Sequence, residues 1–330
     1  MSQDPHEILD SPNPLPVLPK LTQGTAWHFT GAAGFLGIIE SRQLLASSAR
    51  VMNDTSELAY GALVIRQEWD ELNKSPLHND VLDLLGPVFD DELAPNVLKR
   101  LHIISACKGT DSMYQWLGYA QPDGYAIGLD MAGRWEAVHD GEPGEEEAQA
   151  GLDEYGYLSR LHEGWHDVIY TREEQRAATR ALLEWMTTIN ARHALERLDG
   201  PAAPRAFLRA QLQTLMALFK DPAFEAEREV RFLVERHFSP GGGKDYLRFR
   251  TRGSTIIPAL PVARRIDPDA DSLRNHYGQQ PDGPYELPVT GVEVGPNTGP
   301  WAADIAKQVL DSAGIYWIEP QRSLLPRLAT

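Results

Sequence analysis

The sequence predicts an α+β fold. Segments with the alternating or β-branched pattern of strands lie towards both ends of the chain, whereas long helical patterns fill its middle. The steady alternation of strand and helix that characterises a doubly wound parallel sheet is not found, and no internal repeat is detectable. We therefore expect a mixed sheet with helices around it.

The composition indicates a folded, acidic protein. Of its 330 residues, 42% are hydrophobic and 24% are charged, which suffices for a core and excludes global disorder. The 47 acidic residues outnumber the 31 lysines and arginines. The resulting net charge of −16 disfavours a general nucleic-acid-coating role, although a local basic cleft is compatible with it.

The single cysteine, Cys107, excludes an intramolecular disulfide and a cysteine-based zinc site, and it fits a reducing compartment. Neither a secretory signal pattern nor an apolar segment long enough for a bilayer is found. We expect a cytoplasmic protein without a membrane partner.

The first third of the chain begins with a proline-rich segment. Residues 1–20 predict a flexible extended arm, so that residues 21–330 would form one domain. A strand and a helix follow, and a second helix begins behind the capping candidates Asp54 and Thr55. The expected elements are a strand at Thr25–Thr30, helices at Ala32–Leu44, Thr55–Leu72, Val81–Leu85 and Leu93–Arg100, and a buried strand at Leu101–Ala106.

The middle of the chain is predicted to be mainly helical. An acidic stretch at residues 139–154 is interpreted as a solvated loop, and Thr171 is expected to cap a long helix that reaches about Leu198. With a further helix at Ala206–Phe219, this makes a helical insertion at about residues 171–220. The other expected helices are Ser112–Tyr119 and Ala302–Ala313, and the other strands are Gly124–Asp130, Asp167–Tyr170, Glu227–Glu235, Tyr246–Arg250, Ser254–Leu260, Val289–Val294 and Ile315–Ile318.

The segment TGAAGFLG, residues 30–37, has the glycine spacing of a dinucleotide-binding loop. A Rossmann loop needs a longer hydrophobic strand before it and an acidic residue at the end of a second strand about twenty residues later. Here His28 interrupts the strand, and residues 46–54 lack a buried strand pattern. No tyrosine has a lysine four residues after it, as a short-chain dehydrogenase requires. We interpret the glycines as flexibility at a helix start.

The segment His162-Glu163-Gly164-Trp165-His166 matches the zinc-peptidase pattern. That chemistry requires a helix, because only then do both imidazoles share one face. Gly164 weakens such a helix, and a strand-like run follows at once. A zinc hydrolase with Glu184 as a third ligand is therefore the least favoured reading, and we expect no metal.

Three separated groups of residues carry the strongest functional signal. The first is WHFT at 27–30 with Ser47 and NDTSE at 53–57; the second is SAC at 105–107 with YQWLGY at 114–119 and GYAIGLD at 124–130; the third is FEAEREVRF at 224–232. Their order resembles a broad bacterial family of unknown function with the motifs H-[YF]-T, L-N-D-x-x-E, Q-W-x-x-Y, G-[YV]-x-I-G-[FL]-D and E-x-E-x-R. The resemblance runs from about Trp27 to Pro320.

That family is in turn similar to the ADP-ribosyltransferase superfamily. The resemblance implies a split, strongly bent sheet with helices around it. The central cleft of this sheet would bind NAD, which is the substrate. The resemblance implies that His28 hydrogen-bonds the nicotinamide ribose and that Tyr119, or Trp116 as second choice, stacks on the nicotinamide. It further implies Glu229 as the carboxylate that stabilises the cationic sugar and Glu227 as a group that orients the acceptor. The other implied NAD-binding residues are Thr30, Ser47, Ser105 and Arg231.

Two departures from the superfamily pattern concern its subclass. Phe29 replaces the commoner tyrosine after the histidine, which removes a hydroxyl. Ser105-Ala106-Cys107 does not reproduce the Ser-Thr-Ser motif of the arginine-specific transferases.

The chemistry explains why carboxylates would be needed in the third group. Alternation on a strand would place Glu227, Glu229 and Arg231 on one face. Breaking the nicotinamide–ribose bond builds oxocarbenium character, which a fixed carboxylate in a dry cleft stabilises. The same pattern is also typical of a half-buried strand with a salt-bridged outer face, and lone histidines and spaced aromatic residues are often core.

The leading hypothesis is an NAD-dependent ADP-ribosyltransferase-like enzyme, by analogy a toxin or phage-defence effector. Its acceptor is left open between a protein, a nucleic acid and a small molecule. The acidic total charge leans away from nucleic acid, although Lys244, Arg248, Arg250 and Arg252 form a local basic group. The alternative is a non-catalytic protein of the same fold that binds a nucleotide or a partner.

Overall fold

The computed structural model describes residues 18–51, 55–72, 100–120, 122–138, 163–186, 203–236, 247–252, 254–266 and 284–327. The proline-rich segment up to residue 17, the helix expected at Val81–Leu85, all but the last residue of the helix expected at Leu93–Arg100 and the whole acidic stretch at residues 139–154 lie outside these residues. So does the end of the helix that was expected to reach Leu198.

The strands of the described residues join one open, mixed sheet that does not close into a barrel. Its main path runs β10-β9-β2-β3-β1-β4-β11-β12, with β5 and β8 on β9, and β7 between β3 and β6. All pairs are antiparallel except β11 with β12. The strands are β1 (Thr25–Thr30), β2 (Leu44–Ser48), β3 (Leu101–Cys107), β4 (Tyr125–Asp130), β5 (Trp135–Ala137), β6 (Gly164–Asp167), β7 (Glu229–Glu235), β8 (Arg248–Arg252), β9 (Thr255–Arg265), β10 (Tyr285–Glu286), β11 (Val289–Val294) and β12 (Gln321–Arg322).

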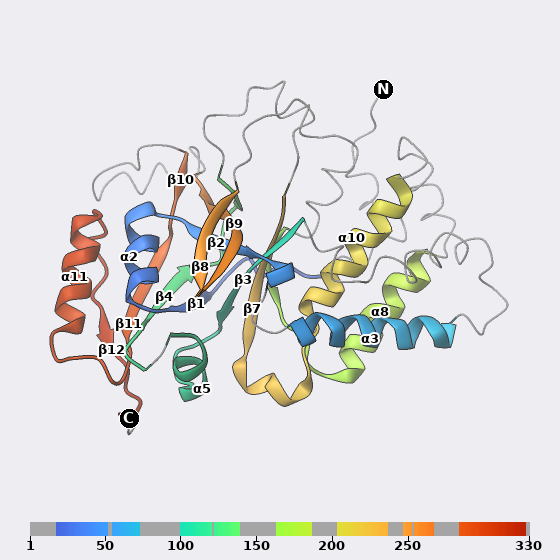
Figure 1. Ribbon diagram of the computed structural model, residues 1–330, viewed down its shortest axis with the longest axis horizontal. Helices are drawn as coiled ribbons and strands as arrows, with labels where there is room; N and C mark the ends of the chain where they lie inside the picture. The colour runs from blue at the N-terminus through green and yellow to red at the C-terminus, as the bar shows by residue number, and fades with distance from the viewer. Residues whose placement is uncertain are drawn as a thin grey trace.

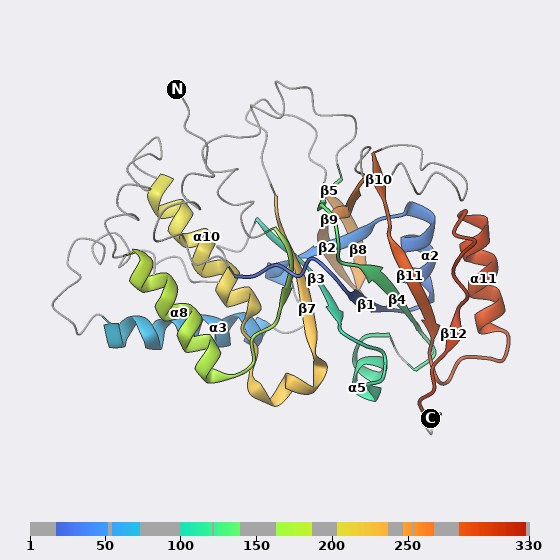
Figure 2. The same ribbon diagram turned by 180° about the vertical axis from the view of Figure 1, so that it is seen from behind.

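Helices gather at the two ends of this sheet. In Figures 1 and 2, α2 and α11 lie beside β4 and β11, whereas α3, α8 and α10 lie beyond β7, and α5 lies between these groups. The helices are α2 (Ala32–Ser41), α3 (Thr55–Leu72), α5 (Met113–Gln115), α8 (Arg172–Met186), α10 (Ala203–Leu218) and α11 (Ala302–Ser312), with the short helices η1 (Ala49–Val51), η3 (Trp116–Ala120) and η5 (Pro222–Glu227).

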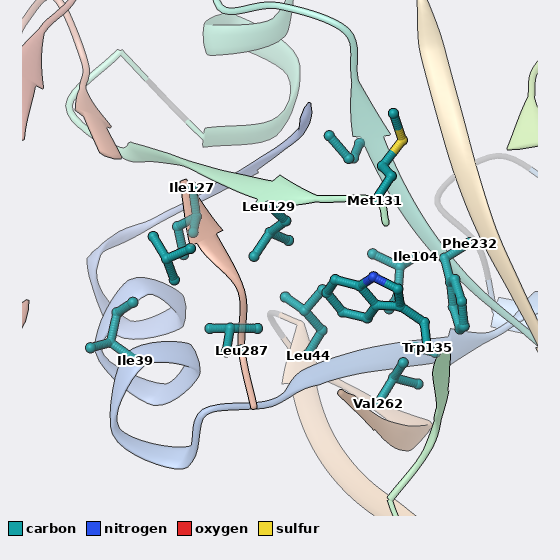
Figure 3. Packing of buried hydrophobic residues seen from close by; sticks show 14 of the residues in the cluster. Ile39, Leu44, Ile104, Ile127, Leu129, Met131, Trp135, Phe232, Val262 and Leu287 are labelled. Carbon is teal, nitrogen blue, oxygen red and sulfur yellow. The ribbon is translucent and has the colours of Figure 1, made fainter. Parts of the chain in front are cut away.

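One face of the sheet is continuously apolar. Val230, Phe232 and Val234 alternate along β7 and are buried in a cluster that includes residues of α2 and α11. Figure 3 shows Phe232 beside Trp135 in this cluster. Each large side chain buried here contributes about 1.5–3 kcal/mol through removal of apolar surface from water.

The opposite face carries two separate apolar clusters. The first packs Leu101, Ile103 and Leu233 against α3, α8 and α10. The second joins Phe29 of β1, Cys107 of β3 and Trp116 of η3. The sheet residues between the two clusters are polar, and they form the candidate site described below.

The crossing of α3 and α10 depends on Gly61. A Cβ atom at this position would lie 2.5 Å from the backbone oxygen of Met216, closer than real Cβ contacts. The glycine therefore allows the two helices to approach, and this fixes α3 over the polar part of the sheet.

The strand β3 is central to the position of the site. One edge pairs with β7 along its whole length, from Leu101 opposite Glu235 to Cys107 opposite Glu229. Its other edge is shared: β2 pairs near the start, and β1 pairs only at Trp27 with Cys107. The strands β1 and β2 therefore part along β3, and residues near Ser105 lie where they separate.

Several predicted elements end elsewhere in the structure. The helix expected to reach Leu44 ends at Ser41, because Arg42 takes a left-handed conformation (φ 54°) and donates from its guanidinium to the carbonyl of Ala313. The next residues form β2, which the helical pattern had concealed. The bounds of β1, α3 and β11 are those predicted.

The prediction of a strand at Ile315–Ile318 is wrong. These residues form turns after α11, and the amide of Ile315 donates to the carbonyl of Leu310. Ile315 and Ile318 are buried, so the apolar spacing reflects packing rather than pairing. The strand expected at Asp167–Tyr170 lies earlier, at Gly164–Asp167.

None of the described helices is both long and apolar enough to cross a lipid bilayer.

Candidate functional site

The strand registers place a set of polar side chains on one face of the sheet. Ser105 lies opposite Arg231, and Ser47 lies opposite Ile103, two residues before Ser105. Since cross-strand partners and every second residue share a face, Ser47, Ser105, Glu229 and Arg231 all point to the side of α3 and α10. We call this row, together with the groups that contact it, the polar strip.

The pair Glu229 and Arg231 forms the centre of the strip. Nε of Arg231 donates to Oε1 of Glu229 at 2.8 Å, and Nη2 donates to Oε2 at 3.0 Å. Nη2 also bonds Oε2 of Glu57 on α3 at 2.6 Å, and Nη1 bonds the carbonyl of Ala217 at 2.6 Å. Both central side chains are almost completely buried. The fork of the guanidinium is thus fully used within the protein.

A buried lysine joins three carboxylates. Nζ of Lys220, just after α10, lies 2.5 Å from Glu227, 3.0 Å from Glu229 and 3.0 Å from Glu57. Burial alone would lower the pKa of Lys220, but the carboxylates of Glu229 and Glu57 outweigh it and raise the pKa. With Arg231, three carboxylates face two cations. When all five groups are ionised, this ion cluster carries one excess negative charge.

The two neighbouring glutamates differ in their ionisation. Burial would raise the pKa of Glu229, but the charge and hydrogen bonds of Arg231, then Lys220 and Ser105, lower it to about 2. Burial raises the pKa of Glu227 above its usual range, and its hydrogen bond to Lys220 only partly opposes this. Glu229 is therefore held as a carboxylate, whereas Glu227 takes up a proton more readily.

The prediction that Glu227 lies on the same strand as Glu229 is wrong. Glu227 ends the helix η5, and Arg228 follows in a left-handed conformation (φ 45°), so β7 begins only at Glu229. Glu227 nevertheless reaches the cluster because the turn brings its side chain onto Lys220. The amide of Gln115 donates to the backbone carbonyl of Glu227 at 2.7 Å and positions this turn.

Tyr119 connects the cluster to solvent. Its hydroxyl donates to Oε2 of Glu227 at 3.2 Å, while 38% of the residue surface is exposed. Burial is the largest influence on Tyr119 and raises its pKa, so the phenol stays protonated and can donate a hydrogen bond. Tyr119 lies in η3, a π-helical turn, a type of turn that frequently marks functional sites.

Trp116, the second candidate for ring stacking, is completely buried. Its ring packs edge-on against Phe29 at 4.9 Å, and its indole nitrogen donates to the carbonyl of Thr110. It supports the turn that carries Tyr119, and only Tyr119 of the two presents an exposed ring.

His28 lies where β1 separates from β3. Its Nδ1 is 3.0 Å from the backbone oxygen of Ser105, and because a carbonyl only accepts, Nδ1 carries the proton. Burial lowers the pKa of His28; the bond to Ser105 opposes this, and the charge of Arg250 lowers it further. His28 is therefore neutral at pH 7, and its Nε2 is an acceptor.

Arg250 reaches the strip from the β8–β9 hairpin. It lies opposite Ile257 on β9, and its Nη2 donates to the hydroxyl of Ser47 at 2.7 Å. Its Nε is buried without a partner among the described residues, and no described carboxylate forms an ion pair with it. Ser105 joins this end to the ion cluster, since its carbonyl bonds His28 and its hydroxyl bonds Glu229.

Thr30 lies away from the strip. Its hydroxyl packs against Gly34 in the first turn of α2, where an added Cβ would come within 2.0 Å of it. The glycine of the apparent dinucleotide loop thus makes room for Thr30 rather than for a cofactor phosphate.

The His-Glu-x-x-His segment does not form the helix that a zinc site needs. His162 lies outside the described residues, and His166 is on strand β6, where its Nδ1 donates to the carbonyl of Pro19 at 3.2 Å. Among the described side chains, no group of three His, Cys, Asp or Glu residues could hold a metal ion.

Three residues of the site had no predicted role. Glu57 belongs to the NDTSE run, whose pattern predicts no role for it, and Lys220 lies at a helix end with no local signal. Tyr170 accepts a hydrogen bond from the backbone nitrogen of Glu229 at 2.9 Å, and so fixes the start of β7. Only the need for buried carboxylates to have counter-charges could have suggested a second cation.

A family model described as a protein of unknown function (DUF2971) matches residues 115–232. This span contains Tyr119, Lys220, Glu227, Glu229 and Arg231, whereas His28, Ser47, Ser105 and Arg250 precede or follow it. It agrees with the predicted resemblance to a family of unknown function. No curated protein and no solved structure matches the chain.

Proposed function

We propose that the chain is an NAD-dependent ADP-ribosyltransferase-like enzyme, which cleaves the nicotinamide–ribose bond and transfers ADP-ribose to an acceptor. We also propose that the sheet of this chain has the split, bent form of that superfamily. The observation that carries it is the ion cluster of Glu57, Lys220, Glu227, Glu229 and Arg231, with its excess negative charge and with Tyr119 at its exposed side.

The excess charge matches the needs of the reaction. The bond from ribose C1′ to the nicotinamide nitrogen breaks, its electron pair leaves with the nicotinamide, and positive charge develops on the sugar. A preorganised carboxylate in dry surroundings stabilises that charge without reorganisation. The acceptor nucleophile then forms the new bond to C1′ and loses a proton.

Glu227 is the better placed of the two candidate carboxylates. Both oxygens of Glu229 are occupied by Arg231, and Lys220 takes a further contact. Glu227 has its contact to Tyr119 on the exposed side, and its raised pKa suits a group that receives the acceptor proton. Glu229 and Arg231 would then position Lys220 and Glu227 rather than touch the sugar.

The remaining polar groups fit parts of NAD. The exposed ring of Tyr119 offers a stacking surface for nicotinamide, and neutral His28 offers an acceptor for a ribose hydroxyl. Toxin or phage-defence activity is an analogy that goes with the superfamily, and the acceptor class is left open.

The first test is to incubate the purified protein with NAD and measure free nicotinamide, with and without cell lysate as acceptor source. We expect Glu227→Gln to lower the rate about 100-fold or more, in line with loss of one electrostatic contact to the reacting centre. The matched control is Glu225→Gln, an exposed residue of the same short helix, which should leave the rate unchanged. Equal rates in both variants would refute the role of Glu227.

A non-catalytic binding protein of the same fold is the second candidate. The saturated hydrogen bonding of Glu229 favours it, because a fully paired carboxylate is also a structural element. NAD binding by the wild-type protein without nicotinamide release, with lysate present, would support this candidate over the enzyme.

A further inference from the structure

We propose that Arg250, together with Ser47 and His28, forms a phosphate-binding subsite that takes the diphosphate of a dinucleotide. The site lies at the end of the polar strip opposite Glu227. It is independent of catalysis, but its assignment to a dinucleotide rests on the proposed function.

The guanidinium of Arg250 is incompletely used within the described protein. Nη2 donates to Ser47, but Nε is buried with no partner, and no described carboxylate balances the charge. A buried donor without an acceptor is unfavourable, and a phosphate oxygen would satisfy it. Arginine is suited to this because its planar fork matches two phosphate oxygens at once.

The neighbouring arginines do not share this position. Arg248, Arg250 and Arg252 lie on the same face of β8, but Arg248 and Arg252 are exposed, whereas Arg250 is half-buried over the sheet. Nη2 of Arg252 donates to the backbone oxygen of Val51. Of the three, Arg250 is thus the arginine that is half-buried and bonded to Ser47 of the polar strip.

Ser47 and His28 add specificity for a sugar phosphate. The hydroxyl of Ser47 accepts from Arg250 and still has its own proton to donate to a phosphate oxygen. His28, neutral with its proton on Nδ1, offers Nε2 to a hydroxyl group. A phosphate that carries a hydroxyl-bearing sugar meets both requirements, whereas inorganic anions meet only the first.

The two ends of the strip set the direction of the ligand. Ser47 on β2 and Arg231 on β7 are separated by β3, a distance of about 10 Å between strands. A diphosphate at Arg250 would therefore extend its ribose past Ser105 towards Lys220 and Glu227. The uncompensated positive charge lies at the phosphate end and the excess negative charge at the end where the sugar becomes cationic.

The test measures binding by calorimetry with ADP-ribose, inorganic pyrophosphate and nicotinamide riboside as probes. We expect Arg250→Gln to weaken ADP-ribose and pyrophosphate about 10- to 100-fold, the loss typical of hydrogen bonds to a charged group. Nicotinamide riboside, which has no phosphate, should bind both proteins equally. The matched control, Arg248→Gln, removes the same charge two residues away and should change affinities less than about threefold.

Further variants keep the proposal testable if Arg250→Gln disturbs the hairpin. Ser47→Ala should weaken the same two probes several-fold, and Arg250→Lys, which keeps the charge without the fork, should restore only part of the affinity. Equal weakening by Arg248→Gln and Arg250→Gln would overturn the subsite, as would equal loss of nicotinamide riboside binding. If Arg248→Gln and Arg250→Gln both abolish binding of a labelled single-stranded oligonucleotide, the hairpin is a nucleic-acid surface instead.

The outcomes separate this inference from the proposed function. If pyrophosphate binding depends on Arg250 but the wild-type protein releases no nicotinamide from NAD, the subsite stands and the enzyme proposal fails. If nicotinamide is released and Arg250→Gln leaves KM for NAD unchanged, the enzyme proposal stands and the subsite fails.

Discussion

The two faces of strand β7 are organised by different physics. Towards α2 and α11, Val230, Phe232 and Val234 pack into a continuous apolar cluster. Towards α3 and α10, Glu229 and Arg231 lie in an ion cluster between two apolar clusters. Burial is nearly complete on both sides, so the difference is not one of exposure to water.

This difference separates what folds the chain from what the fold displays. Apolar contacts are non-directional, and the first face needs only suitable size and spacing. The ion cluster needs exact partners, and taking five charges out of water is costly. Stability alone is a weak reason to keep three carboxylates with two cations, which supports a chemical role for that face.

The largest expected effect comes from removing the cation that serves both Glu229 and Glu57. Arg231→Met leaves two buried carboxylates undercompensated, and we expect it to lower the free energy of unfolding by about 3–5 kcal/mol. Phe232→Leu, its neighbour on the apolar face, should cost about 1–2 kcal/mol. Urea denaturation at pH 7 measures both. A smaller cost for Arg231→Met than for Phe232→Leu would show that the polar face is not held by ion pairing.

The second effect sharpens the comparison through pH. The pKa of Glu229 falls from a reference of 4.5 to about 2, so its contribution is fully present above pH 4.5 and is lost as the pH falls towards 2. This corresponds to about 3 kcal/mol of unfolding free energy. We expect Glu229→Gln to remove this part of the pH dependence, whereas Phe232→Leu should shift the curve uniformly. Denaturation curves between pH 2 and 7 for the three proteins provide the measurement. Parallel curves for wild type and Glu229→Gln would contradict the pairing.

The same contrast explains how much the sequence could reveal. The alternation in β7 placed Val230 and Phe232 opposite Glu229 and Arg231, because side-chain period is a local property. Strand β1 and helix α3 were found at their observed bounds for the same reason. Strand β2 was concealed because Leu44 continues a helical spacing, and only the left-handed Arg42 ends the helix.

The composition of the site was less accessible. Glu227 was placed on the strand because nothing local announces the left-handed turn at Arg228. Lys220 and Glu57 come from distant parts of the chain, and their meeting is decided by the crossing of α3 and α10. The sequence shows Arg250 only as part of a basic group, since its position over β2 depends on the register of the β8–β9 hairpin.

The smallest expected effect concerns Glu227, and its sign is opposite to that of Glu229. Because the pKa of Glu227 is raised in the folded protein, the fold favours its protonated form. Its contribution to stability is therefore present at low pH and declines as the pH rises from 4.5 through the folded pKa. Glu227→Gln keeps a neutral, hydrogen-bonding side chain, so we expect a change of about 1 kcal/mol or less at pH 7. The free energy of unfolding of the wild type minus that of Glu227→Gln should fall as the pH rises. The same difference for Glu229→Gln should increase with pH. If Glu227→Gln costs little stability but stops nicotinamide release, Glu227 is maintained for chemistry. A loss of unfolding free energy at pH 7 as large as that of Arg231→Met would instead make Glu227 a structural member of the ion cluster.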